Sequence, residues 1–271
     1  MTAADGSSGI DTVLVFEGQG AREVPGDPPL DLTAVSPAVA QVAIVRHQVD
    51  RARAFVAAGD AGSVAVLGQS LGELSALVIA GALDLDDALE LARLRAELPG
   101  ALVASRNWTM VSLTRVDLAN ARHAAAGLEL WIVGENGPAD SIIVGEADAW
   151  ATFAGRLALK PATYRQLPVT YPYHTPLMQP VADEVATIVA RLDVRAPFVP
   201  MRSPTGPRVV DGVDGARAVI TDALVAPVAW STALTAAARD WPGARWRECG
   251  PSASLHRFVW KNGLALDWAD A

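Results

Sequence analysis

A serine flanked by two glycines at the end of an apolar run constrains the fold of this chain more than any other feature. Residues 66–73 read Val-Leu-Gly-Gln-Ser-Leu-Gly-Glu, with the pattern G-x-S-x-G centred on Ser70. In such an elbow a strand enters a tight turn, and side chains at the glycine positions would clash with the neighbouring strand and helix. The serine hydroxyl then lies at the N-terminus of the next helix, where N–H groups and the helix dipole stabilise negative charge. The stretch predicts a nucleophile elbow, with an ordinary strand-to-helix turn as the alternative.

The sequence around the elbow predicts the alternating strands and helices of an α/β sheet domain. Apolar β-type runs end at turn residues, and the helical stretches are apolar at helical spacing and rich in alanine. The helix that begins at 83 is expected to end before Pro99 and Gly100, because proline disrupts a helix interior. We expect strands at 12–16, 63–67 and 246–248, a turn-rich loop at 202–207, and helices at 37–58, 71–80, 83–96, 178–192, 216–225, 227–238 and 253–264.

Residues 106–169 show a different pattern, which predicts a small inserted subdomain. The order of elements there is strand, helix, strand, strand, helix, strand, as in a split βαβ, ferredoxin-like unit. Residues 1–105 and 170–271 then form the large subdomain. Two strands of the insertion meet at Asn136-Gly137-Pro138, a strong turn signal, so the Asn136 amide either faces a cleft or stabilises the turn. The small subdomain elements are expected at 109–114, 116–125, 128–134, 141–145, 147–159 and 162–169.

Composition and charge exclude several classes of protein. The 271 residues carry a formal charge of −8, so no basic stripe is available to displace counterions from nucleic acid. We find no apolar run of eighteen residues and no export signal, and therefore expect a cytoplasmic protein without a membrane partner. The single cysteine, Cys249, rules out an internal disulfide framework and fits a reducing compartment.

A serine in an elbow needs a base, because an unassisted hydroxyl is a poor nucleophile at neutral pH. Of the four histidines, His174 alone lies in a loop whose flanking prolines fix the backbone. His47, His123 and His256 are in polar or arginine-rich helical stretches and are expected at the surface. The imidazolium needs an orienting acceptor, and no carboxylate stands out in the sequence. A Ser-His dyad oriented by a backbone carbonyl and a full triad both remain open.

Acyl transfer at such a serine also needs donors for the oxyanion. The backbone N–H of Leu71, directly after the serine, is one natural donor, and that of Gln19 is the other. Gln19 lies between two glycines at the end of the first strand, which is a suitable place to aim an amide into a site. Its alternative role is that of an ordinary loop amide.

Several motifs in series resemble those of a known family. In chain order they are G-Q-G after the first strand, G-x-S-x-G-E at the elbow, Arg95 near the end of a helix, N-G-P, a loop histidine before T-P-L-M, and E-C-G-P. They are similar to motifs of the malonyl-CoA:acyl carrier protein transacylases and of polyketide synthase acyltransferase domains, over nearly the whole chain. The resemblance implies an α/β-hydrolase-like large subdomain with an inserted ferredoxin-like small subdomain.

The resemblance also implies the roles of individual residues. Ser70 is acylated from a thioester, His174 is the general base and acid, and Gln19 with Leu71 forms the oxyanion hole. Arg95 matches the arginine that pairs with the free carboxylate of a malonyl-type acyl group, for which a planar guanidinium is well suited. The resemblance implies no bound cofactor and no metal. Acyl-CoA or acyl-phosphopantetheine is a substrate, and an acyl carrier protein is the partner.

Departures from the family pattern leave the acyl group and its donor, CoA or a carrier, open. Gln69 stands where the family usually has histidine. The residues before His174, Tyr171-Pro172-Tyr173, match neither of the two four-residue patterns familiar for malonyl and methylmalonyl selection. Leu71, after the serine, favours malonyl, whereas Tyr171 favours methylmalonyl. A dicarboxylic unit for polyketide or fatty acid biosynthesis remains the leading substrate. The residues expected to contact substrate are Arg95, Gln69, Tyr171, Tyr173 and, by analogy alone, Asn136.

Three functions are compatible with these residues. The first is an acyltransferase that loads an acyl carrier protein, the second is an acyl-thioester hydrolase that clears stalled carriers, and the third is an inactive scaffold. Arg95 favours the first, because a hydrolase that edits monoacyl chains has no use for a buried arginine. Acyl carrier proteins are usually acidic, as this chain is, so docking requires a local basic patch, such as arginines of the small subdomain or the C-terminal helix.

Overall fold

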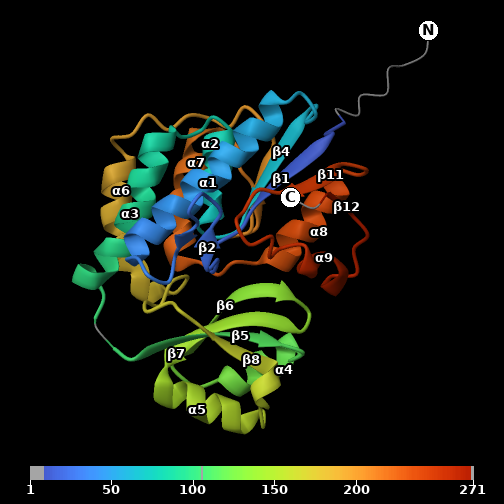
Figure 1. Ribbon diagram of the computed structural model, residues 1–271. Coiled ribbons are helices and arrows are strands. Elements are labelled where there is room, and N and C mark those ends of the chain that lie inside the picture. The colour runs from blue at the N-terminus through green and yellow to red at the C-terminus, as the bar shows by residue number, and fades with distance from the viewer. Residues whose placement is uncertain (1–8, 105, 270–271) are drawn as a thin grey trace.

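The computed structural model describes residues 9–104 and 106–269 of the chain. Within these residues the strands form a six-stranded sheet, a four-stranded sheet and a two-stranded ribbon (Figure 1). The large sheet has the order β10-β9-β4-β1-β11-β12, and its strands are parallel except for β10. Its strands are β1 (Thr12–Phe16), β4 (Val64–Gly68), β9 (Met201–Ser203), β10 (Arg208–Val209), β11 (Arg245–Glu248) and β12 (Asp267–Ala269).

The central strand β1 is buried on both faces, as is typical of a parallel sheet covered by helices. Leu14 and Phe16 face one hydrophobic core, and Val13 and Val15 face another. Figure 1 shows the helices on both faces of the sheet, with α8 and α9 on the side opposite to the larger group. The helices of this part are α1 (Pro37–Ala57), α2 (Gly72–Ile79), α3 (Leu85–Leu102), α6 (Gln179–Val189), α7 (Gly212–Val225), α8 (Trp230–Asp240) and α9 (Arg257–Lys261).

The four-stranded sheet is antiparallel and has the order β6-β7-β5-β8. Helices α4 and α5 cover the face turned away from the large sheet, over a core that contains Phe153 (Figure 1). Met110, Val133 and Val144 of the other face belong to the main core, so the small sheet is packed onto the rest of the chain. The order β-α-β-β-α-β confirms the ferredoxin-like pattern. Its elements are β5 (Trp108–Thr114), α4 (Leu118–Ala125), β6 (Leu130–Gly137), β7 (Asp140–Glu146), α5 (Ala147–Arg156) and β8 (Tyr164–Leu167).

Short elements complete the described chain. The ribbon of β2 (Glu23–Val24) and β3 (Leu30–Asp31) follows β1. Two 3-10 turns, Pro161–Thr163 and Pro176–Met178, precede β8 and α6. Most expected helices and strands agree with the structure within a few residues at their ends, and three predictions need correction.

The prediction that a helix ends before Pro99 is wrong, because α3 continues through the proline to Leu102. Pro99 has no N–H to donate to the carbonyl of Arg95, four residues earlier. The Tyr173 hydroxyl donates to that carbonyl instead, at 2.8 Å. The carbonyl is therefore paired, and the N–H of Val103 restores the helical pattern by donating to Pro99 O at 3.0 Å.

The segment expected as a loop at 202–207 is partly a strand. Met201 pairs with Val66 of β4, and β10 returns antiparallel to β9. A strand of three residues is too short for a period of two to be recognised in the sequence. The structure corrects the prediction because this strand continues the large sheet beyond the elbow.

The closing helix expected at 253–264 is much shorter in the structure. It is confined to α9, and β12 extends the sheet after it. The carboxylate of Glu248 accepts hydrogen bonds from the N–H groups of Leu255, at 2.9 and 3.0 Å, and of His256, at 3.3 Å. These bonds bind the start of the expected helix to the end of β11, so the helix begins later.

Candidate active site

The elbow around Ser70 has the geometry that its glycine pattern predicts. β4 ends at Gly68, α2 begins at Gly72, and Ser70 between them has a φ of 55°. A Cβ on Gly68 would lie 2.4 Å from the carbonyl oxygen of Gly72, and one on Gly72 would lie 2.3 Å from that of Phe16. Backbone atoms cannot move aside as a flexible side chain can, so both positions require glycine.

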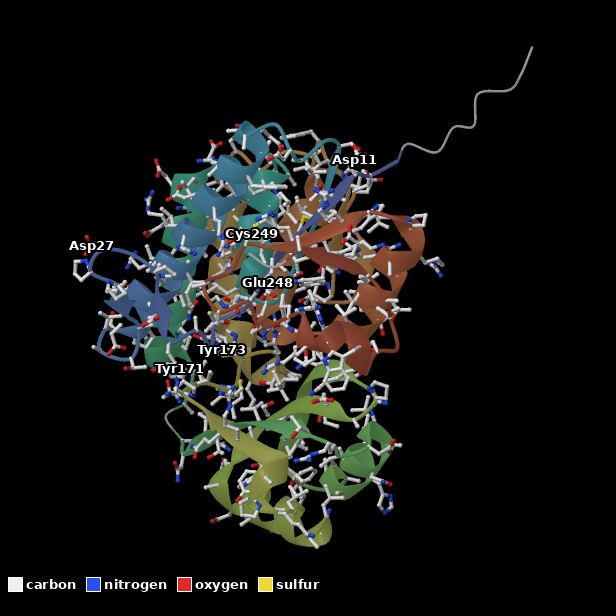
Figure 2. The ribbon with its side chains drawn as sticks, turned by 45° about the vertical axis from the view of Figure 1, so that its right-hand side comes forward. Asp11, Asp27, Tyr171, Tyr173, Glu248 and Cys249 are labelled. Atoms are coloured by element: carbon white, nitrogen blue, oxygen red, sulfur yellow. The ribbon has the colours of Figure 1, made fainter. Side chains whose placement is uncertain are left out.

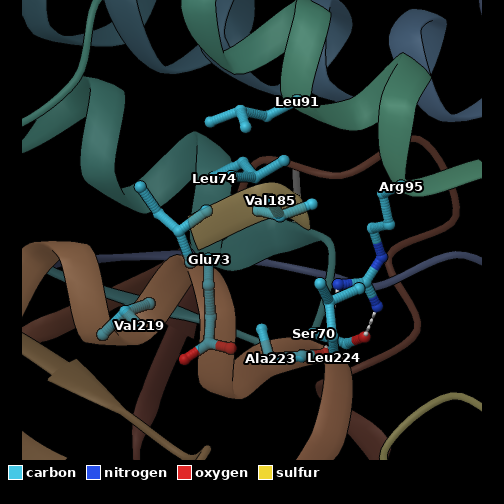
Figure 3. Close-up of a pocket in the computed structure, with 10 residues that line it drawn as sticks. Ser70, Glu73, Leu74, Leu91, Arg95, Val185, Val219, Ala223 and Leu224 are labelled. Carbon is cyan, nitrogen blue, oxygen red and sulfur yellow. Dashed lines mark hydrogen bonds between the residues drawn. The ribbon is translucent and has the colours of Figure 1, made fainter. Parts of the chain in front are cut away.

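The Ser70 hydroxyl has two partners from distant parts of the sequence. Its Oγ lies 2.8 Å from Nε2 of His174. It also accepts a hydrogen bond from Nη2 of Arg95 at 2.9 Å, which Figure 3 shows. The serine is on the elbow, the arginine is on α3, and the histidine is on the loop before α6. The structure therefore brings together three of the residues that the sequence singled out.

His174 is held in one orientation by its backbone and by its second ring nitrogen. Its φ is 65°, and its N–H donates to Leu224 O at 2.7 Å. Nδ1 lies 3.1 Å from the carbonyl oxygen of Ala226, which fits an Nδ1–H donor and leaves Nε2 free to accept the Ser70 proton. Of the two arrangements left open by the sequence, the structure has the dyad oriented by a carbonyl.

The imidazole of His174 is neutral at physiological pH. Its pKa is lowered to about 3, mainly by burial and also by the positive charge of Arg95, while the carbonyl of Ala226 opposes both effects. Only 7% of the residue is exposed. A neutral imidazole is the form that can take a proton from the serine.

The other histidines differ from His174 in position. His123 and His256 are exposed, as expected. His47 is half-buried, and burial lowers its pKa, so the expectation that it lies on the surface is wrong. The charges that act on its imidazole are those of Arg51 and Asp50 on its own helix, α1, and of Glu17, which directly follows β1.

Arg95 is a buried cation, with 5% of the residue exposed. Its Nη1 donates to Ala223 O at 3.2 Å, while Nε has no partner within the described chain. Its guanidinium lies 5.0 Å from the centre of the Tyr173 ring. Burial lowers the pKa of Arg95, and the neighbouring Tyr173 and Glu73 oppose that shift. A buried guanidinium with unused donor capacity beside Ser70 is suited to bind an anionic group.

Glu73, which follows the second glycine of the elbow, is a residue that the sequence reasoning missed. It is 1% exposed, and its carboxylate accepts hydrogen bonds from the hydroxyls of Ser203 and, at 2.8 Å, Thr205. Burial raises its pKa to about 7, against these hydroxyls and the charge of Arg95. The glutamate ties α2 to β9 and thereby fixes the start of the elbow helix. Its place in the motif G-x-S-x-G-E was the available signal.

A cavity of about 60 Å³ lies between the elbow and the small sheet. Ser70, His174, Gln19, Gln69 and Asn136 all contribute to its wall. Gln69 Nε2 donates to Asn136 Oδ1 at 3.1 Å, so the Asn136 amide faces the cleft and joins the elbow to β6. Gln19 Oε1 accepts from Nε2 of the buried Gln41 at 3.2 Å. Gln41, on α1, is a second residue that the sequence reasoning missed, and unlike Glu73 it belongs to no motif.

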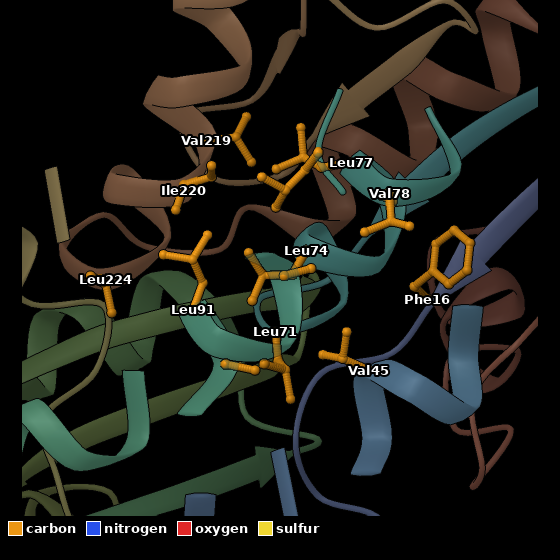
Figure 4. Packing of buried hydrophobic residues seen from close by; sticks show 14 of the residues in the cluster. Phe16, Val45, Leu71, Leu74, Leu77, Val78, Leu91, Val219, Ile220 and Leu224 are labelled. Carbon is orange, nitrogen blue, oxygen red and sulfur yellow. The ribbon is translucent and has the colours of Figure 1, made fainter. Parts of the chain in front are cut away.

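A smaller cavity of about 20 Å³ lies on the other side of Ser70, between Arg95 and Glu73 (Figure 3). Its remaining walls are aliphatic side chains of α2, α3, α6 and α7. Leu71 has its side chain in the hydrophobic core (Figure 4). Its backbone is at the N-cap of α2, and the first N–H groups of a helix have no partner within the helix.

Tyr171 and Tyr173 lie where the part of the chain with the large sheet meets the small sheet (Figure 2). Their rings are 6.4 Å apart and nearly perpendicular. Tyr173 is 3% exposed, and Tyr171 lies against Gly100, where an added Cβ would be 3.1 Å from its hydroxyl. The described walls of the two cavities at Ser70 include neither tyrosine. Both tyrosines contact α3, Tyr171 at Gly100 and Tyr173 at Arg95, and the Arg95 guanidinium in turn bonds Ser70.

An open cleft of about 700 Å³ continues from the cavity at Ser70. Gly18, Gln19 and Gln69 border both spaces. Arg22, Arg165 and Arg257 lie along the cleft, and the structure gives Arg165 and Arg257 no ion-pair partner among residues 9–104 and 106–269. Partial burial lowers the pKa of Arg257, and the nearby Arg165 lowers it further. Two guanidinium groups that repel one another form a suitable site for an anion.

The two carboxylates beside the cleft, Glu17 and Glu248, accept hydrogen bonds from hydroxyl and backbone N–H groups. Glu17 accepts hydrogen bonds from Ser252 N at 2.7 Å, from the Ser252 hydroxyl, and from Ser254 Oγ at 2.7 Å. Burial raises the pKa of Glu248 to about 7. The two carboxylates hold the segment 250–256, which forms one rim of the cleft, at the ends of β1 and β11.

Neither a metal site nor a membrane span is visible in the described chain. Within residues 9–104 and 106–269, no group of three or more His, Cys, Asp or Glu side chains is arranged to hold a metal ion. None of the helices there is both long enough and apolar enough to cross a bilayer.

The fold and the site together define a class. A serine on a nucleophile elbow, paired with a buried histidine on an α/β-hydrolase-like sheet with an inserted ferredoxin-like unit, is characteristic of acyl-transfer proteins. The chain belongs to the acyl transferase domain family, which it matches over residues 29–245.

Similar proteins place the chain within this family. It is 30% identical over 200 residues to the malonyl CoA-acyl carrier protein transacylase of Escherichia coli K12, covering 72% of this chain. It is 29% identical over 220 residues to the polyketide synthase GfsB of Streptomyces halstedii, covering 79% of this chain. The match spans 64% of the E. coli protein and 4% of the synthase. The resemblance seen in the motifs is thus confirmed.

A solved structure agrees with the fold along nearly the whole chain. The malonyl-CoA:acyl carrier protein transacylase of Xanthomonas oryzae pv. oryzae superimposes with a TM-score of 0.85 at 26% identity. The superposition covers 96% of this chain and 94% of that one. The predicted fold class is confirmed.

Proposed function

We propose that this chain is an acyltransferase that moves a short acyl group from a CoA or carrier thioester, through an ester on Ser70, to the phosphopantetheine thiol of an acyl carrier protein in polyketide or fatty acid biosynthesis. The observation that carries the proposal is the position of Ser70 Oγ, 2.8 Å from His174 Nε2 and 2.9 Å from Arg95 Nη2. A base and a carboxylate-binding cation at one hydroxyl suit a malonyl or related dicarboxylic unit.

The reaction is a ping-pong exchange in which Ser70 carries the acyl group. Ser70 Oγ attacks the thioester carbonyl as His174 Nε2 takes its proton, and the tetrahedral intermediate collapses with loss of the thiolate. The imidazolium returns the proton to the thiolate. In the second half, His174 takes the proton of the incoming carrier thiol, the thiolate attacks the ester, and Ser70 regains its proton.

The surrounding groups have supporting roles in the proposal. The N–H groups of Leu71 and Gln19 stabilise the oxyanion. Arg95 binds the free carboxylate of the acyl unit, and this contact favours dicarboxylic units over acetyl. Gln69 and Asn136 form the amide part of the wall beside the reacting carbonyl. Cavities of about 20 and 60 Å³ at Ser70 favour a short acyl group over a long fatty acyl chain.

The cleft beside the site suits the pantetheine arm of either thioester. It is continuous with the cavity at Ser70, and its arginines attract phosphate although the chain as a whole carries a charge of −8. Arg165 and Arg257 are the proposed phosphate contacts. The four-stranded sheet that contributes Arg165 also supports the proposed boundaries, with a large subdomain of 1–105 and 170–271 and a small one of 106–169. We propose acyl-CoA and an acyl carrier protein as partners and a cytoplasmic location.

The fate of the acyl group tests the proposed function. The protein is mixed with malonyl-CoA, and intact-protein mass spectrometry follows its acylation with and without holo acyl carrier protein. We expect a malonyl ester on the protein that passes to the carrier, and no ester on Ser70→Ala. Ser75→Ala is the control, because the Ser75 hydroxyl bonds Gln48, at 2.6 Å, and not the site. Rapid release to water without carrier labelling would instead identify a hydrolase, and absence of any ester would identify an inactive scaffold.

A further inference from the structure

Tyr173 and Pro99 meet at the backbone of Arg95, outside the two cavities. In a regular helix the N–H of residue 99 would donate to the carbonyl of Arg95. Proline has no such hydrogen, so a buried acceptor is left on the residue whose side chain reaches Ser70. The Tyr173 hydroxyl donates to this carbonyl at 2.8 Å and replaces the missing bond.

Tyr173 contacts both the backbone and the side chain of Arg95. Besides the bond to the carbonyl, the face of its ring lies 5.0 Å from the guanidinium carbon. Tyr173 directly precedes His174, and the N–H of His174 is held by Leu224 O at 2.7 Å. A single buried side chain therefore connects the helix that carries the arginine with the loop that carries the histidine.

We propose that Tyr173 is a positioning residue for acyl-group selection. Its hydroxyl has this role because Pro99 has no N–H to donate to the Arg95 carbonyl. This inference depends on the proposed function, in which Arg95 binds the carboxylate of the acyl unit. The hydroxyl fixes the backbone of Arg95, and the ring fixes the plane of the guanidinium. Without the hydroxyl, the carbonyl is buried and unpaired, and the segment around Arg95 shifts until the carbonyl finds a partner.

The consequence is specific to acyl groups that carry a carboxylate. A displaced guanidinium weakens a two-point contact with carboxylate, which depends on direction as well as distance. An acetyl group makes no such contact, and it needs only Ser70 and His174. A change at Tyr173 that merely loosened the protein would reduce both activities together.

The test is a rescue experiment with Tyr173→Phe, Pro99→Ala and the double variant. We expect Tyr173→Phe to lower kcat/KM for malonyl-CoA roughly tenfold and that for acetyl-CoA at most about twofold, consistent with loss of one buried hydrogen bond. Alanine at position 99 supplies the missing N–H, so Pro99→Ala in the Tyr173→Phe background should restore the malonyl-to-acetyl ratio to within about threefold of the unmodified protein. Tyr164→Phe, on the small sheet, is the matched control and should leave the ratio unchanged.

Two outcomes would overturn the inference. One is an unchanged malonyl-to-acetyl ratio in Tyr173→Phe, and the other is a lowered ratio that Pro99→Ala does not restore. If Tyr173→Phe folds poorly, thermal unfolding of the unmodified protein, both single variants at 99 and 173 and the double variant gives the answer, because rescue by Pro99→Ala must then appear in the melting temperature as well. Failure of the proposed function is separate, since it would appear as the absence of a malonyl ester in the unmodified protein.

Discussion

The two walls of the site are built differently. The elbow wall is formed by Ser70, Arg95 and His174, of which Arg95 and His174 are buried. Direct hydrogen bonds link the three side chains, and left-handed backbone fixes Ser70 and His174. The sheet wall, from the four-stranded sheet, offers one amide, Asn136, among aliphatic side chains of Met110, Val133, Ile142 and Leu167. The first wall is specialised for chemistry, and the second for shape.

The difference suggests how one scaffold accommodates different acyl groups. On the elbow wall, changes to Ser70 or His174 remove the reacting groups and therefore affect every substrate, whereas a change to Arg95 affects mainly acyl groups that carry a carboxylate. Changes on the sheet wall alter the space and polarity around the acyl group, and leave the serine and histidine in place. Each of the following predictions tests one wall, the bond between the walls or the cleft that continues from them.

Replacing Arg95 by alanine has the largest expected effect on selectivity. Loss of a charge-assisted contact with a carboxylate lowers kcat/KM for malonyl-CoA by about 100-fold. Acetyl-CoA turnover falls far less, because Ser70 and His174 remain. Steady-state kinetics with both thioesters measure the ratio. Unchanged malonyl selectivity would remove Arg95 from the substrate site.

Removing the cleft arginines has a smaller effect, which depends on phosphate. The Arg165→Gln, Arg257→Gln double variant should raise KM for malonyl-CoA about tenfold, and leave kcat almost unchanged. Malonyl-pantetheine, which has no phosphate, should be used equally well by both proteins. Transfer from malonyl-pantetheine to holo carrier protein then shows whether the arginines also contact the phosphate of the carrier arm, because CoA is absent from that reaction. Equal losses with malonyl-pantetheine would show that these arginines do not contact phosphate.

Much of the elbow wall was predictable from sequence, because its geometry depends on a local rule. Gly68 is required by the backbone of Gly72, four residues further on, and Gly72 by the backbone of Phe16 on the neighbouring strand. Both contacts follow from the tight turn between a sheet strand and a helix, and such a turn leaves a motif. His174 was also identified, because flanking prolines restrict its loop. The acceptor for its Nδ1 is the backbone of Ala226, and a carbonyl leaves no trace in residue type.

The remaining differences between the predictions from sequence and the structure arise from contacts between residues that are distant in sequence. Pro99 predicts a helix end by its local effect, and Tyr173 compensates for it from 74 residues further along the chain. The strand at 201–203 forms because β4 is there to pair with it. The bond between Gln69 and Asn136 likewise depends on how two sheets pack. Tertiary contacts of this kind override local propensity.

The bond between the walls predicts a measurable coupling. Gln69→Met and Asn136→Leu each remove one amide from the pair, which is 3.1 Å apart. Each change should lower kcat/KM for malonyl-CoA about fivefold, and the double variant should lose little more than either single one. This corresponds to a coupling free energy of about 1 kcal/mol. Gln166→Met, on exposed β8, is the control. Additive losses would mean that the amides act separately.

The smallest expected effect concerns pH. It tests whether burial or the charge of Arg95 is the main cause of the low pKa of His174 on the elbow wall. His174 accepts a proton from Ser70 only when it is neutral, so its activity is lost as pH falls through its pKa. With that pKa at about 3, acylation by acetyl-CoA should be constant from about pH 5 to pH 8. Removing the positive charge of Arg95 raises the pKa, and the acid limb moves to higher pH.

The extent of that movement distinguishes the two causes. Burial is the larger cause of the shift, and it persists in Arg95→Ala, so the acid limb should stay well below the ordinary histidine pKa of 6.5. The variant should then keep at least about half of its neutral-pH acylation rate at about pH 5, as measured by rapid quench with acetyl-CoA. Arg95→Lys, which retains a positive charge, should follow the unmodified protein. An acid limb near 6.5 in Arg95→Ala would mean that the arginine, and not the burial of the elbow wall, keeps the histidine neutral.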